Sequence, residues 1–241
     1  MMLNLADLVI LMLGVSVGSF VQSTSGIGFA LVVVPVFLMI LPDDLPSTII
    51  LLMILLNIYI YMSERDHADI LGVIWITAGR IPGTLVGVFL LSQFSDRTIG
   101  YLVGASMLAA VGLTALKPSF RVTKKTFVGV GLFTGATETA TGIGGPPIAL
   151  IYQHRPSEVL RSTVACCSFV GQIVSAIGLA ILGNIGSDQI RTTLMLLPAL
   201  AAGIVGGKFV FRHIDRSRMR VSVLVLATAS SVALLTRDLW Q

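Results

Sequence analysis

The sequence predicts an all-α polytopic membrane protein made of two inverted-topology repeats, each with about five hydrophobic segments. Three observations predict this: a very apolar composition, a series of apolar runs of helical length, and a polar, glycine-rich motif that occurs twice. Of the 241 residues, 55% are hydrophobic and 12% are charged, and the mean hydropathy is +0.93. Soluble domains usually carry about 25% charged residues, so this composition excludes a water-soluble particle.

Apolar runs mark ten segments along the chain. They cover residues 5–21, 28–41, 46–63, 69–91, 98–116, 126–139, 146–153, 160–183, 190–211 and 218–236. A full span needs about 20 residues, so segments 28–41 and 146–153 are candidates for half-helices or arms of re-entrant hairpins. Length alone leaves open whether they cross the bilayer. The first run lacks a basic flank and carries Asp7, which favours a retained first helix over a signal peptide.

Positive charges fall unequally into alternate loops. One set of loops holds eleven, namely Arg65, Lys117, Arg121, Lys124, Lys125, Arg155, Arg161, Arg212, Arg216, Arg218 and Arg220; the other holds three, namely Arg97, Arg191 and Arg237. Cytoplasmic loops are enriched in Lys and Arg, so the first set is predicted to be cytoplasmic. We therefore expect a multi-pass protein of the plasma (inner) membrane with both termini on the non-cytoplasmic side.

Three pairs of stretches suggest an internal duplication. The motif "QSTSGIG" (22–28) aligns with "ETATGIG" (138–144) at a shift of 116 residues. "LPST" (45–48) aligns with "LRST" (160–163) at 115, and "GTLVG" (83–87) with "GIVGG" (203–207) at 120. Five segments in each half make the second half enter from the opposite side. The prediction is a first repeat at 1–116, a cytoplasmic linker at 117–125 and a second, inverted repeat at 126–241, a layout typical of secondary transporters.

The two motifs interrupt helices within apolar surroundings. Non-helical backbone at membrane depth is tolerated only when it is buried in protein or lines a water-filled cavity. Glycine and proline suit such a break, and the free N–H groups of the following helix attract an anion. Tight packing of small residues is the competing interpretation. The candidate substrate-binding residues of the motifs are Gln22, Ser23, Thr24, Ser25, Gly26, Gly28, Glu138, Thr139, Thr141, Gly142, Gly144, Gly145 and Pro146.

Further polar residues lie inside the predicted spans, where charges are costly and usually functional. Arg80 either binds the anion directly or pairs with Glu138 as an internal strut, and Glu138 is also a candidate proton-coupling carboxylate. Asn57 and Gln172, which are aligned at the shift of 115, either donate to a bound oxyanion or hydrogen-bond across helices. Lys208 is expected to snorkel to the membrane surface.

Enzymatic chemistry is not expected. The two cysteines, Cys166 and Cys167, are adjacent in an apolar run and are predicted to be small core residues. The loop Asp and His residues form no metal-ligand or catalytic spacing, and the glycine motif lacks the Lys-Ser/Thr of a phosphate-binding loop. The sequence therefore predicts no metal, no cofactor and no nucleic-acid partner.

The stretches "GSFVQSTSGIGFALVVVPVF" and "GLFTGATETATGIGGPPIALIY" resemble the paired signature segments of the TauE/SafE family of membrane permeases, also called sulfite exporters. Gly26, Gly28 and Pro35 match in the first half, and Gly142, Gly144, Gly145 and Pro146 match in the second. The first copy departs from the pattern, with "GIGFA" where a third glycine is common. The resemblance covers the whole chain.

The resemblance implies transport of a sulfur-containing oxyanion: sulfite, a sulfonate or thiosulfate. The expected function is a secondary transporter that works by alternating access, with an anion-selective channel as the alternative. The expected partners are a small anionic substrate, the lipid bilayer and a coupling ion, either a proton or sodium, and a homodimer is compatible with the sequence. Neither the anion nor the direction of transport follows from these residues.

Overall fold

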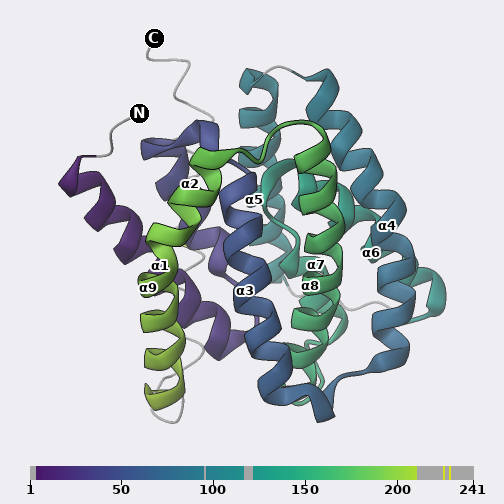
Figure 1. Cartoon of the computed structure of the whole chain (residues 1–241). Helices are drawn as coiled ribbons and strands as arrows, with labels where there is room; N and C mark the ends of the chain where they lie inside the picture. The colour runs from purple at the N-terminus through teal and green to yellow at the C-terminus, as the bar shows by residue number, and fades with distance from the viewer. Residues whose placement is uncertain (1–3, 95, 117–121, 211–224, 226–227, 229–241) are drawn as a thin grey trace.

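The computed structural model describes residues 4–94, 96–116, 122–210, 225 and 228, and these residues form helices and no strand (Figure 1). The α-helices are α1 (Leu5–Ser25), α2 (Phe29–Ile40), α3 (Ser47–Glu64), α4 (Ile70–Gln93), α5 (Asp96–Leu116), α6 (Lys124–Thr141), α7 (Gly145–Ile151), α8 (Ser157–Ile181) and α9 (Ser187–Val210). Short 3-10 helices, η1 (Pro42–Asp44) and η2 (Arg65–His67), flank α3. Residues 117–121 of the predicted linker lie outside the described residues. The same holds for the predicted segment 218–236, except for residues 225 and 228.

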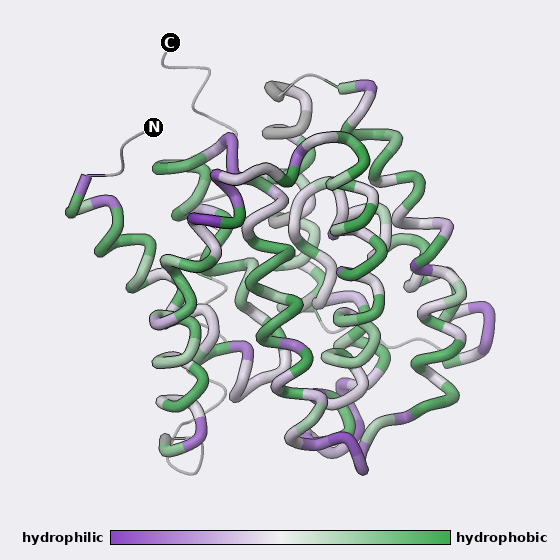
Figure 2. The backbone as a smooth tube through the Cα atoms, in the orientation of Figure 1, coloured by the Kyte–Doolittle hydropathy of each residue, from purple (hydrophilic) through white to green (hydrophobic). Residues whose placement is uncertain are grey.

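Among the described residues, five helices are long and apolar enough to cross a membrane. They are Leu5–Ser25, Ser47–His67, Ile70–Gln93, Ser157–Ile181 and Ser187–Phe209, whereas Phe29–Ile40 and Tyr101–Leu113 are shorter apolar helices. Large apolar side chains such as Leu13, Leu85 and Ile177 face outward. Hydrophobic residues follow the helices along their length, and hydrophilic ones gather mainly where the chain turns (Figure 2). The protein is therefore a multi-pass, all-helical membrane protein.

Side-chain caps fix where several helices begin. Asn4 Oδ1 accepts from the Asp7 N–H at 2.7 Å at the start of α1, and Asp69 Oδ1 accepts from the Gly72 N–H at 3.1 Å at the start of α4. Thr123 caps α6 in the same way. Such caps satisfy N–H groups that lack a partner in the first turn. Each predicted segment up to residue 211 corresponds to one α-helix in this part of the chain.

Glycines bring α4 and α6 into backbone contact. A Cβ built on Gly79 would lie 2.0 Å from the carbonyl oxygen of Val128, and one on Gly83 would lie 2.1 Å from that of Leu132. A step of four residues along α4, from Gly79 to Gly83, matches a step of four residues along α6, from Val128 to Leu132, so the two helices run in the same direction. Small residues allow this approach between membrane helices, where packing and backbone contacts drive association.

A second parallel pair forms between α1 and α9. Ser16 Oγ donates to the Ala199 carbonyl at 2.9 Å, and a Cβ on Gly203 would lie 2.1 Å from the Ser16 carbonyl oxygen. In Figure 1 this pair lies on one side of the molecule, and α4 with α6 lies on the other. The helices α3 and α8 pack against each other between these two pairs.

Substitution of Gly79 by alanine is expected to destabilise the protein. Its Cβ would collide with the backbone carbonyl of Val128, which cannot move as a side-chain tip does. Overpacking of this kind lowers the free energy of unfolding by about 1–3 kcal/mol. In a chain of this size, each kcal/mol lost lowers Tm by about 2–4 °C. Thermal unfolding of the purified protein in detergent measures the loss.

The matched control is Gly129→Ala in α6. A Cβ on Gly129 meets no atom within 4 Å, so its Tm should stay at or slightly above that of the wild type, because alanine favours a helix over glycine. Equal Tm values for the two variants would contradict the close approach of α4 and α6.

Candidate functional site

The first break separates α1 from α2. It consists of residues 26–28, because α1 ends at Ser25 and α2 begins at Phe29. Gly26 and Gly28 have φ angles of 82° and 122°, values that residues with a Cβ rarely adopt. The Gly26 N–H donates to the Gln22 carbonyl at 2.8 Å and so closes the last turn of α1.

The second break has the same design. Here α6 ends at Thr141, and Gly142, with φ of 78°, donates its N–H to the Glu138 carbonyl at 2.7 Å. Pro146 lies in the first turn of α7, where no N–H is needed. A Cβ on Gly145, the first residue of α7, would lie 3.5 Å from the side chain of Ile27, so the start of α7 lies beside the first break.

The hydroxyl residues of both motifs lie in the last helical turns rather than in the breaks. Ser23 Oγ donates to the Phe20 carbonyl at 3.0 Å, and Thr139 Oγ1 donates to the Gly135 carbonyl at 2.8 Å. Thr24, Ser25 and Thr141 donate to carbonyls one turn back in the same manner. The helix α1 thus extends four residues past the predicted end at 21, and its last hydroxyls bond to carbonyls one turn back.

A buried chain of hydrogen bonds starts at the first break. The Phe29 N–H, at the start of α2, donates to Gln22 Oε1 at 3.2 Å. Gln22 Nε2 donates to the Gly26 carbonyl at 3.2 Å and makes a longer contact of 3.4 Å with Asn57 Oδ1. Asn57 lies on α3 and is fully buried, so the polar chain passes from the break into the centre of the bundle.

The chain continues from α3 to the second break. Asn57 Nδ2 donates to Gln172 Oε1 at 3.1 Å, and Gln172 Nε2 donates to Glu138 Oε1 at 2.6 Å. Arg80 Nη2 donates to Glu138 Oε2 and forms an ion pair in which both side chains are fully buried. One continuous polar chain thus links the first break, α3, α8 and the last turn of α6 to Arg80 on α4.

Arg80 occupies a position made by a glycine. A Cβ on Gly171 would lie 2.0 Å from Arg80 Nε, so the guanidinium lies against the bare backbone of α8. Arg80 Nε and Nη1 donate to no group among the described residues, although both atoms are buried. Buried donors in proteins nearly always have an acceptor, which makes these two atoms a feature that a bound ligand would explain.

The second break also sets the position of the carboxylate. A Cβ on Gly144 would lie 2.6 Å from both Glu138 Cβ and Glu138 Oε2. Gly144 itself has φ of −140°, so glycine is required there by space rather than by the backbone angle. Glu138 therefore reaches Arg80 and Gln172 because the break leaves room for it.

Sequence reasoning missed a second charged pair. Arg161 was predicted to be a loop cation, but it lies in α8 with 4% of its side chain exposed. Its Nε is 3.0 Å from each carboxylate oxygen of Glu64, and its Nη1 donates to the Thr24 carbonyl at 3.4 Å. The "LRST" stretch was singled out only as a repeat match, and nothing local indicated that Arg161 reaches the first break.

The sequence-predicted residues thus fall into three groups in the structure. Gln22, Asn57, Arg80, Glu138 and Gln172 form the buried polar chain; Gly26, Gly28, Gly142, Gly144, Gly145 and Pro146 form the breaks and the start of α7; Ser23, Thr24, Ser25, Thr139 and Thr141 donate to carbonyls of their own helices. Ser25 and Thr141 also bond to the backbone of the breaks, and Thr139 bonds to Ser175 on α8. Lys208 is exposed near the end of α9, and both cysteines are buried.

Comparison with known proteins identifies the family. The model of the family described as "Sulfite exporter TauE/SafE" matches residues 10–234, which is nearly the whole chain. No curated protein and no solved structure matches this chain. The chain therefore belongs to the TauE/SafE sulfite exporter family of membrane transporters.

Proposed function

We propose that this protein is a secondary transporter that moves a small sulfur-containing oxyanion, of the sulfite, sulfonate or thiosulfate class, across the plasma membrane by alternating access. One observation carries the proposal: the buried polar chain that runs from the Phe29 N–H to Arg80 connects the first break to Glu138 in the last turn of α6, directly before the second break. Polar groups inside a membrane are costly and usually mark a substrate or ion pathway. Membership of the TauE/SafE sulfite exporter family supports a sulfur-containing oxyanion as the substrate.

Two inverted repeats, at 1–116 and 126–241 with a linker at 117–125, account for the pairing of the helices. Gly83 approaches the Leu132 carbonyl on α6, and Gly203 approaches the Ser16 carbonyl on α1. Gly83 advanced by 120 residues is Gly203, and Ser16 advanced by 116 residues is Leu132, so the two shifts relate the two contacts to each other. These are the shifts at which the two halves of the sequence align.

A neighbouring contact follows the same rule. A Cβ on Gly87 would lie 2.7 Å from Thr139 Cβ, and one on Gly207 would lie 2.3 Å from Ser23 Oγ. The same two shifts relate Gly87 to Gly207 and Ser23 to Thr139. This agreement supports a pseudo-two-fold relation between the halves, the arrangement in which transporters place a substrate site between their repeats.

The ion pair between Arg80 and Glu138 supplies a means of coupling the movement of a proton to the movement of the oxyanion. A guanidinium binds oxyanions through paired N–H groups, and Arg80 has two such groups without an acceptor among the described residues. Glu138 competes with an incoming oxyanion because both are negative and both bind Arg80. Protonation of Glu138 removes this competition, so a proton on Glu138 accompanies the oxyanion on Arg80.

Flux through proteoliposomes that contain the purified full-length protein tests the proposal. Liposomes preloaded with unlabelled sulfite, methanesulfonate or thiosulfate should accumulate the labelled form of the transported anion by counterflow. An inward proton gradient should increase the accumulation, whereas a response to sodium alone would make sodium the coupling ion. An anion channel would equilibrate label without counterflow, and absence of flux for all three anions would overturn the proposed function.

A further inference from the structure

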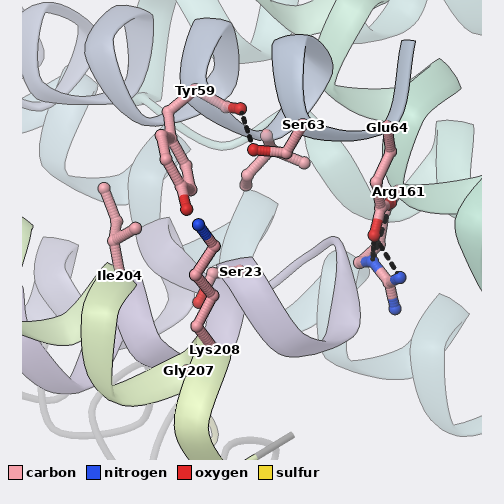
Figure 3. Close-up of a pocket in the computed structure, with 9 residues that line it drawn as sticks. Ser23, Tyr59, Ser63, Glu64, Arg161, Ile204, Gly207 and Lys208 are labelled. Atoms are coloured by element: carbon pink, nitrogen blue, oxygen red, sulfur yellow. Dashed lines mark hydrogen bonds and ion pairs between the residues drawn. The ribbon is translucent and has the colours of Figure 1, made fainter.

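A pocket of about 250 Å³ lies where α3 and α9 end and α8 begins, away from Arg80. We call it the α3–α9 pocket (Figure 3). Its walls are Ser23, Tyr59, Ile60, Ser63, Glu64, Arg161, Ile204, Gly207 and Lys208. A water takes about 30 Å³ of liquid volume, so the pocket has room for a small oxyanion together with several waters.

The charge of Arg161 is already neutralised inside this wall. Glu64 holds its Nε with both carboxylate oxygens at 3.0 Å, and Glu158, outside the lining, lies 3.8 Å from its Nη2. Its Nη1 is directed to the Thr24 carbonyl at the end of α1. Arg161 therefore fixes the wall between the pocket and the first break, and its pair with Glu64 adds little net charge to the lining, whereas Glu158 is 43% exposed and lies outside it.

Lys208 is the cation of the lining that has no carboxylate partner in the described part of the chain. Its Nζ lies 5.6 Å from the centroid of the Tyr59 ring, which attracts a cation and holds the ammonium over the pocket. Figure 3 shows the Tyr59 hydroxyl directed toward this ammonium group. The hydroxyl donates to no other described residue, so the Tyr59 O–H and the Lys208 ammonium can both donate to one anion.

The pocket adjoins the first break on its inner side. Ser23 of the motif lines it, and the neighbouring Thr24 carbonyl receives the hydrogen bond from Arg161. An anion in the pocket is thus separated from the polar chain by the last turn of α1. By the distribution of positive charges, this end of the bundle is the one expected to face the cytoplasm.

We propose that the α3–α9 pocket is a second anion subsite, in which Lys208 Nζ and the Tyr59 hydroxyl bind a singly charged sulfur oxyanion beside the first break. This assignment rests on the proposed function for the identity of its ligand. One uncompensated ammonium matches one negative charge, so hydrogensulfite and alkanesulfonates are favoured over sulfate and thiosulfate, which carry two. The subsite collects the anion at one face of the membrane before it reaches Arg80.

Substitution of Lys208 by glutamine tests the subsite by binding, which needs no transport. Calorimetric titration of the purified full-length protein with methanesulfonate should show about tenfold weaker binding to the variant, since one charged hydrogen bond is lost. Lys208→Arg, which keeps the charge, should retain most of the affinity. In proteoliposomes, Lys208→Gln should raise KM for the same anion by a similar factor and leave the maximal rate near that of the wild type.

The matched control is Lys124→Gln, because Lys124 Nζ also lies over an aromatic ring, 5.0 Å from the centroid of Trp75, and does not line the pocket. Equal methanesulfonate affinity for wild type and Lys208→Gln, an equal loss in Lys124→Gln, or tighter binding of sulfate would overturn the subsite. If binding behaves as expected and no sulfur oxyanion is transported, the subsite stands and the proposed transport function fails.

Discussion

Replacement of Arg80 by methionine is expected to abolish transport and to lower the free energy of unfolding by about 3–5 kcal/mol. The variant leaves Glu138 as a charged group with no exposed surface and no cationic partner. Removal of one member of a buried ion pair costs far more than the pair itself contributes. Uptake in proteoliposomes and thermal unfolding in detergent measure the two effects, and a fall in Tm of about 10 °C is expected.

A double variant separates stability from function. Arg80→Met combined with Glu138→Leu removes both charges, and apolar replacement of a buried ion pair is often neutral or stabilising by about 1–4 kcal/mol. Its Tm should therefore return close to the wild-type value, while uptake should remain absent. Normal uptake by this double variant would show that Arg80 and Glu138 only hold α4 and α6 in place, and the substrate role of the pair would be wrong.

The all-helical, multi-pass membrane architecture was accessible from the sequence because membrane helices carry their signal locally. A long apolar run identifies each helix without knowledge of its neighbours. The glycines that end α1 and α6 were also recognisable in the sequence, because glycine is the residue that readily adopts a positive φ angle. Gly26 and Gly142 do adopt such angles. The signature segments around them were sufficient to indicate the TauE/SafE family, which the match over residues 10–234 shows.

The contacts that shape the site were not accessible, because they depend on residues far apart in the chain. Arg161 bonds to Glu64, 97 residues away, and neither residue has a local feature that distinguishes it from a surface charge. Gly171 was not singled out, yet its missing side chain makes the space that Arg80 occupies. For Arg80 itself the sequence left two interpretations, and the structure pairs it with Glu138. Its role in substrate binding stays a prediction.

Substitution of Gly144 by alanine is expected to remove most of the transport activity at a moderate cost in stability. The new Cβ would lie 2.6 Å from Glu138 Cβ and Oε2, a distance that forces the carboxylate or the break to move. A displaced Glu138 would lose its alignment with Gln172 and Arg80 together. Overpacking costs about 1–3 kcal/mol, so the variant should fold, and its uptake can be compared with that of wild type at equal reconstituted amounts.

The adjacent glycine provides the control for this prediction. A Cβ on Gly145 would lie 3.5 Å from Ile27, an ordinary van der Waals contact, and Gly145 belongs to α7. Gly145→Ala adds the same methyl group one residue away without reaching Glu138, so it should transport near the wild-type rate. Equal losses in both variants would mean that the break tolerates no added bulk at all. Normal transport by Gly144→Ala would show that the position of the carboxylate does not govern transport, and Glu138 would then lose its place in the coupling mechanism.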